Sequence, residues 1–234
     1  MRKIILIFTL LLFAAPSSSR AQIGLGGFHS VMTVPSAQLQ RDGDITFGIG
    51  YVPDPYGYVG EGYNTLAYFA NVGFLPFMEI GLRATRALDY VLPSIGDRML
   101  IVRLRLLKEA PHRPAIVIGM HDPYRAASPG EAGHFNALYA VASKTVFAAK
   151  RFTLDATVGY GTDWFKEAYF HEFDGLFGGA SLGYRRLIFL KGEYDAIRFN
   201  IGGGLELGKF LAANVVWIDA KKAAFGINLK KSLL

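Results

Sequence analysis

The sequence predicts an all-β protein, a transmembrane antiparallel β-barrel of about twelve strands that follows a cleaved signal peptide. Three observations lead to this fold. Apolar and polar residues alternate in short segments along most of the chain, which is the periodicity of strands with two different faces. The connections between these segments are alternately long and short, as in outer-membrane barrels. The first residues have the composition of a secretory signal.

The segment 1–21 is expected to be the signal peptide. Arg2 and Lys3 precede an apolar run from Ile4 to Ala15, and small residues end the segment at Ala21. The run is shorter than the roughly 20 apolar residues with which a helix spans a bilayer, although an uncleaved anchor is the alternative. The rest of the chain is long enough for one large β domain and contains no cysteine, so we expect a fold without disulfides.

The next segment, 22–43, shows neither helical nor strand periodicity for long. Pro35 fixes its own φ and favours an extended conformation at Val34, and Asp42-Gly43 is typical of a tight turn. We therefore expect an N-terminal segment that lies inside the barrel or beneath it on the periplasmic side.

Residues 44–234 are expected to form the barrel. In 151–161, RFTLDATVGYG, apolar residues alternate with polar residues and glycine. The segments MEIGLRAT (78–85) and IFLKGEYDA (188–196) alternate equally clearly, and a helix would scatter their charged residues around its circumference. The same pattern predicts strands at 44–52, 65–74, 78–86, 98–107, 114–121, 135–146, 151–161, 174–184, 187–196, 199–207, 210–218 and 222–231.

The connections predict the orientation of the barrel. With twelve strands, both termini lie on the periplasmic side, and the long connections form the extracellular rim. Two further outer connections, near 197–198 and 219–221, should be tight. The long connections are 53–64, 87–97, 122–134 and 162–173, and the short ones are 75–77, 108–113, 147–150, 185–186 and 208–209.

Composition also favours a membrane β protein. The chain contains Gly 27, Tyr 12 and Phe 18 and has a mean hydropathy of +0.25; aromatic residues favour strands and membrane interfaces. The alternative is a soluble sandwich or lipocalin-like barrel with the apolar face inward, but a soluble barrel of twelve strands would enclose more volume than these side chains fill. The net charge of +6 is dispersed, so we do not expect nucleic acid as a partner.

If the apolar residues face lipid, the opposite face of each strand lines the lumen. The polar groups there would either pair into a network that blocks flow or line a narrow path for a polar solute. Phe69, Ile101, Phe177 and Phe189 share this face, so part of the interior should be packed. The predicted luminal charges are Glu79, Arg83, Arg103, Arg105, Lys144, Asp155, Lys191, Glu193, Asp195 and Glu206, accompanied by His121 and Asn214.

Two luminal arginines suggest a binding site. Arg103 and Arg105 are two residues apart and should point inward from one strand. Guanidinium groups bind carboxylates and phosphates bidentately, so the pair could hold an acidic glycan. The alternative is that Glu79 or another luminal acid neutralises them.

The sequence contains no catalytic motif of the G-x-S-x-G or H-E-x-x-H type. We expect no catalytic residue, metal or cofactor, although two clusters, His121-Asp122 and His171-Glu172 with Asp174, have the composition of a metal or base site. Ser181 lies on a luminal position without an assignable partner. Tyr56, Tyr58 and Tyr63 in the first long connection could stack against sugars or form part of an interfacial girdle.

Two stretches resemble a known family. The segment 32–52, MTVPSAQLQRDGDITFGIGYV, resembles the opening of the YjbH-type outer-membrane proteins, which are associated with exopolysaccharide. The segment 71–85, NVGFLPFMEIGLRAT, is similar to the next hairpin of that family. The resemblance implies an outer-membrane barrel linked to polysaccharide production or export, and it supplies no catalytic residues. The family phrase is carried here by Met32, Pro35, Ser36, Ala37, Asp42 and Gly43, with Thr33 as an additional residue.

The function expected from these observations is that of a non-enzymatic protein of the bacterial outer membrane, acting in exopolysaccharide biosynthesis or export or in envelope organisation. Its expected partners are outer-membrane lipid, an anionic polysaccharide and periplasmic envelope proteins. Two alternatives remain open: a channel for small solutes or oligosaccharides, and a lipid-modifying enzyme with its site at the rim.

Overall fold

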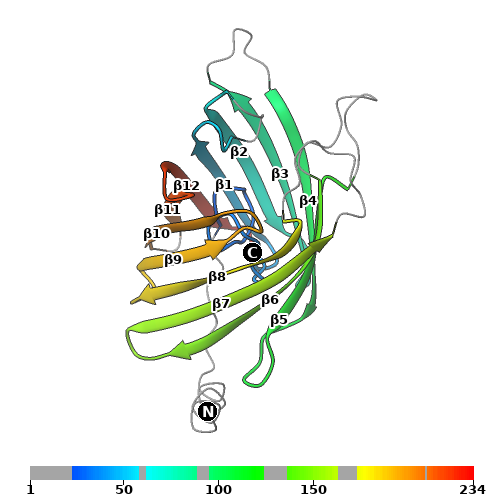
Figure 1. The fold of residues 1–234 in the computed structure, drawn as a ribbon. Helices are drawn as coiled ribbons and strands as arrows, with labels where there is room; N and C mark the ends of the chain where they lie inside the picture. Colours follow the sequence, from blue (N-terminus) through cyan, green and yellow to red (C-terminus); the bar gives the residue numbers. More distant parts are fainter. Residues whose placement is uncertain (1–22, 58–61, 89–94, 124–135, 163–172, 209) are drawn as a thin grey trace.

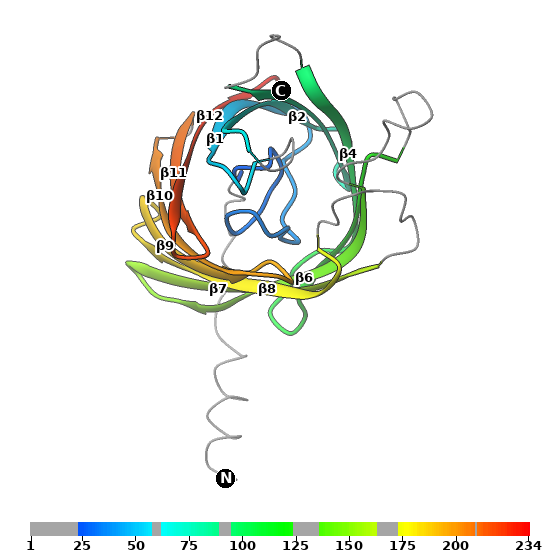
Figure 2. The same cartoon turned by 45° about the horizontal axis from the view of Figure 1, so that its top comes forward.

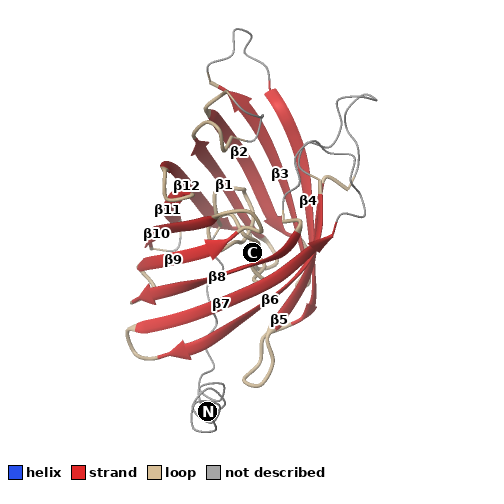
Figure 3. Ribbon diagram, viewed as in Figure 1, coloured by secondary structure: helices blue, strands red, loops and turns tan. Residues whose placement is uncertain are grey.

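The computed structural model describes residues 23–57, 62–88, 95–123, 136–162, 173–208 and 210–234. Their regular secondary structure is β-strand, and the strands close into an antiparallel barrel (Figures 1 and 3). None of these residues forms a helix long and apolar enough to cross a membrane. The strands are β1 (Asp44–Val52), β2 (Thr65–Gly73), β3 (Met78–Ala87), β4 (Ile95–Leu107), β5 (Ala115–His121), β6 (Ala137–Ala148), β7 (Phe152–Thr162), β8 (Gly175–Tyr184), β9 (Ile188–Tyr194), β10 (Phe199–Leu207), β11 (Leu211–Ile218) and β12 (Lys222–Ser232).

The all-β class and the closed barrel of twelve antiparallel strands confirm the prediction. Each strand pairs with its neighbours in sequence, and β1 closes the barrel by pairing with β12 from Asp44 to Tyr51. Closure leaves no free sheet edge. Because β1 begins and β12 ends at the same end of the barrel, we call this the terminal end and the other the distal end.

The outward face of the barrel is apolar. In β7, for example, Val158 and Tyr160 are exposed, whereas the alternate residues Gly159 and Gly161 are buried. Every one of the twelve strands carries at least one large apolar side chain that is exposed. Polar and charged side chains such as Glu79 are buried on the opposite face. The faces of this barrel are therefore the reverse of those in a soluble barrel.

The N-terminal segment lies inside the barrel. Residues 23–40, which we call the plug, run through the centre of the lumen as irregular loops (Figure 2). The plug has its own backbone hydrogen bonds, such as those from Val31 N to Val34 O and from Ser36 N to His29 O. Between the plug and β1, Gly43 has a φ of 75°, a left-handed conformation that suits glycine in a turn.

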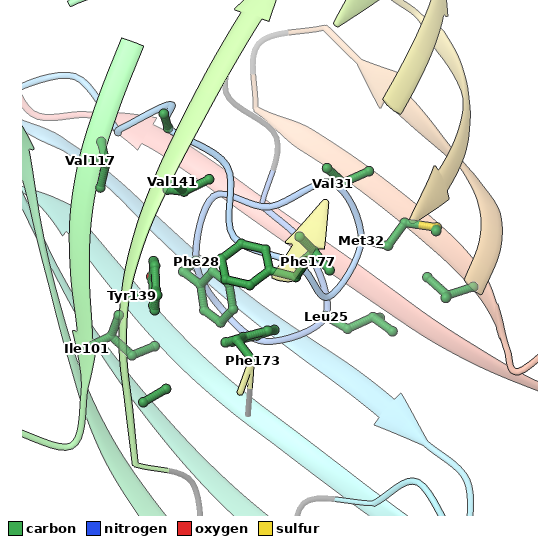
Figure 4. Close-up of a cluster of buried hydrophobic side chains, with 14 of the residues drawn as sticks. Leu25, Phe28, Val31, Met32, Ile101, Val117, Tyr139, Val141, Phe173 and Phe177 are labelled. Carbon is green, nitrogen blue, oxygen red and sulfur yellow. The ribbon is translucent and has the colours of Figure 1, made fainter. Parts of the chain in front are cut away.

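The hydrophobic core is the contact between the plug and the wall. Figure 4 shows Leu25, Phe28, Val31 and Met32 of the plug beside side chains from the surrounding strands. The ring of Phe28 lies 6.3 Å from that of Phe173. A lumen of twelve strands is too wide for side chains of opposite walls to meet, so the plug supplies the missing apolar surface. The labelled wall residues are Ile101, Val117, Tyr139, Val141, Phe173 and Phe177.

Several luminal glycines make room for aromatic rings. Gly159 is paired across the strands with Phe177, and a Cβ atom at Gly159 would lie 2.2 Å from the Phe177 ring. Gly119 is covered in the same way by Tyr139, its partner on β6. Each ring lies over its glycine partner, in the space that a Cβ atom would occupy. Glycine is therefore needed at these two positions because an aromatic ring approaches the backbone closely.

The replacement Gly159→Ala is therefore expected to destabilise the barrel by about 1–3 kcal/mol, because the Phe177 ring must move out of a packed position. The control is Gly192→Ala, since an added Cβ at Gly192 meets nothing within 4 Å and should change stability by less than about 0.5 kcal/mol. Urea unfolding of the refolded barrel measures both. Equal stabilities for the two variants would contradict this packing role.

Candidate functional site in the lumen

Glu79 of β3 is a buried junction between the plug and the wall. From the plug, His29 Nδ1 lies 2.6 Å from Glu79 Oε2, and the Gln40 backbone N–H donates to the same oxygen at 2.7 Å. From the wall, Arg103 Nη1 and Asn71 Nδ2 donate to Oε1 at 3.1 and 3.2 Å. One carboxylate thus joins the plug to β2, β3 and β4.

Arg103 of β4 extends this junction. Its ion pair with Glu79 is completely buried, which requires both groups to have further polar partners. Arg103 Nη1 also donates to the carbonyl of Gln38 at 3.2 Å, and Nη2 donates to the carbonyl of Ser36. The guanidinium therefore holds the second half of the plug by its backbone.

Glu193 of β9 holds the first half of the plug from another part of the wall. Its carboxylate accepts the backbone N–H groups of Met32, Thr33 and Val34 at 2.9, 2.9 and 3.1 Å. The Thr33 hydroxyl donates to it at 2.5 Å, and Asn200 Nδ2 at 3.2 Å. Successive backbone N–H groups that converge in this way form an anion-binding nest. The chain thus places a nest in its plug and the matching anion in its wall.

Neutral side chains of the wall satisfy other backbone groups of the plug. Asn214 and Asn228 both donate to the carbonyl of Ile23, at 3.1 and 2.8 Å. Asn71 donates to the carbonyl of Gly27 at 2.8 Å, and the Ser143 hydroxyl accepts the N–H of Ala37 at 2.7 Å. An irregular buried segment needs such partners because it has no strand ladder of its own. Sequence reasoning missed Asn71 and Asn228, although both occupy luminal positions.

The plug residue His29 is neutral in this buried environment. Burial lowers the pKa of His29, Arg103 and Lys230 lower it further, and Glu79 opposes them. The net shift of the His29 pKa is downward, because burial disfavours an imidazolium group beside Arg103. The neutral ring then donates its Nδ1–H to Glu79, while Arg103 balances the charge of that carboxylate.

Most of the predicted luminal charges lie in the lumen. Arg83 and Lys191 are buried there like the three charged residues described above, and Lys191 Nζ donates to Asn214 Oδ1 at 3.2 Å. Asp155 and Glu206 are partly buried on luminal positions. Asp155 Oδ1 accepts a hydrogen bond from the Thr145 hydroxyl at 2.7 Å.

Lys144 and Asp195 differ from the prediction. The buried residues Ser143 and Thr145 flank Lys144, so Lys144 occupies an outward position; its Nζ reaches the carbonyl of Ala110 at 2.5 Å. The apolar residues Tyr139 and Val141 of β6 face inward toward the plug instead of lipid, so the opposite set of positions, which includes Lys144, faces outward. Asp195 follows the end of β9 and lies in the turn to β10, where Oδ1 accepts the N–H groups of residues 197 and 198.

The predicted basic patch does not form. Arg103 pairs with Glu79, whereas Arg105 lies closer to the terminal end and donates to the carbonyl of Pro76 at 3.1 Å. The two side chains have the same parity, but different partners hold them. Arg103 is thus neutralised by Glu79, which was the alternative expected from the sequence. The two guanidinium groups therefore do not form a joint binding site for an acidic glycan.

The candidate catalytic groups lie in different surroundings. His121 is buried among rings, 4.8 Å from Phe28 and 5.3 Å from Tyr139 between ring centroids. His171, Glu172 and Tyr58 lie outside the described residues. Ser181 lines a cavity of about 50 Å³ between the plug and the wall. Among the described residues, no three His, Asp or Glu side chains gather in a way that could hold a metal ion.

The fold and these contacts define a class of protein: a closed antiparallel barrel whose lumen is occupied by its own N-terminal segment. A family model described as exopolysaccharide biosynthesis protein YbjH, the YjbH family, matches residues 21–233. The chain belongs to this family, which confirms the resemblance, and the description of the family links it to exopolysaccharide biosynthesis. A comparison with curated proteins finds no match.

The replacement Glu193→Ala is expected to release the first half of the plug, because it leaves the backbone N–H groups of Met32, Thr33 and Val34 without their acceptor. If the free energy of plug docking falls by about 3 kcal/mol, hydrogen exchange of these three amides should become roughly a hundredfold faster. The control Asp44→Asn alters a buried carboxylate that pairs with Lys230 within the wall. Unchanged exchange in Glu193→Ala would contradict the anchor.

Acidification is expected to weaken the docking of His29. Above its ordinary pKa of 6.5, the docked and released side chains are both neutral, and docking has its full strength. As the pH falls through 6.5, the released imidazole takes up a proton, whereas the buried imidazole stays neutral. The contribution of His29 to docking therefore decreases, and it is fully lost below the lowered pKa of the docked side chain. Urea unfolding at pH 7.5 and 5.5 measures this. The free energy of unfolding of His29→Gln should decrease less between these two pH values than that of the intact chain. An equal decrease would contradict the role of His29 in the pH dependence.

Proposed function

We propose that this chain is a non-enzymatic barrel of the bacterial outer membrane that serves exopolysaccharide biosynthesis or export with its lumen closed. The observation that carries the proposal is the plug, fixed across the lumen by Glu79 and Arg103 on one part of the wall and by Glu193 on another. Family membership supports the link to exopolysaccharide. A braced interior suits a protein that organises other envelope components.

The outward face supports a membrane location. Exposed apolar side chains occur on every strand, among them Leu190, Ile201 and Phe225. Exposure of such a belt to water would cost roughly 25 cal/mol per Å², and a continuous apolar surface is typical of contact with lipid. In this proposal segment 1–21 directs export, and the terminal end of the barrel faces the periplasm.

A channel is the second candidate, and one observation favours it. Polar groups, including Ser143, Asp155 and Ser181, line the cavity between the plug and the wall. Its volume of about 50 Å³ holds a few water molecules, whereas pockets for organic ligands measure roughly 300–1,000 Å³. Passage of a sugar would therefore require the plug to move, which supports the closed barrel as the first proposal.

A lipid-modifying enzyme has less support. The ring cluster around His121 leaves that side chain buried in the lumen, so a lipid outside the barrel does not reach it. We therefore propose a non-enzymatic role. The partners proposed for it are outer-membrane lipid, an anionic polysaccharide and periplasmic envelope proteins.

The replacement Leu190→Arg tests the membrane location. Leu190 is 60% exposed on β9, so a guanidinium there would be harmless in water but should cost about 2–4 kcal/mol in the apolar part of a bilayer. The control Leu187→Arg lies in the turn between β8 and β9 and should cost at most about 1 kcal/mol. Folding into phosphatidylcholine vesicles measures both. Equal stabilities would count against a lipid-facing β9.

Conductance and complementation test the function. In a planar bilayer the intact chain should give no steady open level, whereas Glu79→Ala with Glu193→Ala should give openings because both anchors of the plug are removed. In a strain that lacks this protein, the intact chain should restore secreted exopolysaccharide. Steady conductance of the intact chain would favour the channel, and full exopolysaccharide without the protein would contradict the proposed role.

A further inference from the structure

A basic recess lies at the terminal end of the barrel, outside the plug contacts. It is formed by two neighbouring turns, one between β6 and β7 and one between β8 and β9, and its volume is about 380 Å³. A hydrogen bond from Arg185 N to Arg151 O, 2.6 Å long, joins the two turns. The lining residues are Lys150, Arg151, Thr153, Arg185 and Arg186.

The cations of this recess have no acidic partner in the part of the chain that the structure describes. Such a gathering of like charges is unfavourable without an anion. Arg185 and Arg186 also have φ values of 51° and 55°, a left-handed conformation that asparagine and glycine adopt more readily. The turn thus holds two arginines at some cost to the fold.

The recess adjoins the apolar belt. Phe152 and Tyr184 face outward as a cross-strand pair, with ring centroids 5.1 Å apart. The guanidinium of Arg185 lies over the Tyr184 ring, 5.5 Å from its centroid, so it is directed to the outer side of the wall. Phe152 and Ile188 at the ends of β7 and β9 are exposed. Cations and an apolar surface therefore meet where the strands end.

We propose that this recess binds the phosphate of an anionic glycerophospholipid, with the acyl chains against Phe152, Tyr184 and Ile188. Arginine matches phosphate geometry with paired N–H donors, and cations next to an apolar surface attract anionic headgroups. The aromatic pair on the outer side favours a lipid over an acidic glycan, which would approach from the aqueous end. This inference rests on the membrane location proposed above and adds a lipid preference to it.

The double variant Arg185→Asn with Arg186→Gly is the sharpest test, because it removes two cations and places residues suited to positive φ in the turn. The barrel should therefore remain folded. Native mass spectrometry of the intact chain in detergent would compare dioleoylphosphatidylglycerol, dioleoylphosphatidylcholine and inorganic phosphate as probes. The matched control is Lys108→Gln with Arg113→Gln, which removes two exposed cations from another turn at the same end.

The intact chain and the control should bind phosphatidylglycerol in preference to phosphatidylcholine, and the double variant should lose this preference by on the order of tenfold. Equal binding of phosphatidylglycerol by the double variant would overturn the proposal. Binding of inorganic phosphate alone, or displacement of the lipid by an oligogalacturonate, would also overturn it. A chain that folds into phosphatidylcholine vesicles but shows no lipid preference contradicts this inference alone, whereas failure to fold there contradicts the membrane location.

Discussion

The fixation of the plug by buried carboxylates is the interaction on which the rest of the structure depends. A lumen enclosed by twelve strands cannot be filled by the wall alone, and the irregular plug that fills it brings unpaired backbone groups into a dry space. Glu79 and Glu193 solve this problem from different parts of the wall, each by accepting backbone N–H groups of the plug. These hydrogen bonds determine how the plug is oriented against the wall, and the apolar contacts of Phe28 and Met32 stabilise it in that position.

The same constraint explains the phrase at residues 32–43 by which the sequence resembles its family. Residues 32–34 supply the nest for Glu193, and the following residues offer carbonyls to Arg103. Thr33, the additional residue in this phrase, contributes both its N–H and its hydroxyl. A motif that looks like a lead-in to the first strand therefore belongs to the interior of the barrel. It binds the wall through Glu193 and Arg103.

The candidate site was predictable in part. The alternation in the strands placed Glu79, Arg103 and Glu193 correctly on one face, because side chains alternate along a strand whatever its partners. It failed for Lys144, because the apolar residues Tyr139 and Val141 of β6 pack inward against the plug and not toward lipid. The alternation also predicted that Arg103 and Arg105 form one basic patch, which they do not. The position of a residue in a strand shows whether its side chain points inward, but not which groups it contacts there.

The sequence by itself determined the class of fold, the number of strands and the family, because periodicity, turn residues and a short phrase are local properties of the chain. Only the tertiary structure decided that residues 23–40 occupy the lumen and that Glu193 meets Met32. These contacts join residues about 160 positions apart. Their partners are selected by closure of the barrel, which brings β3 and β9 around a common centre, and no local pattern carries that information.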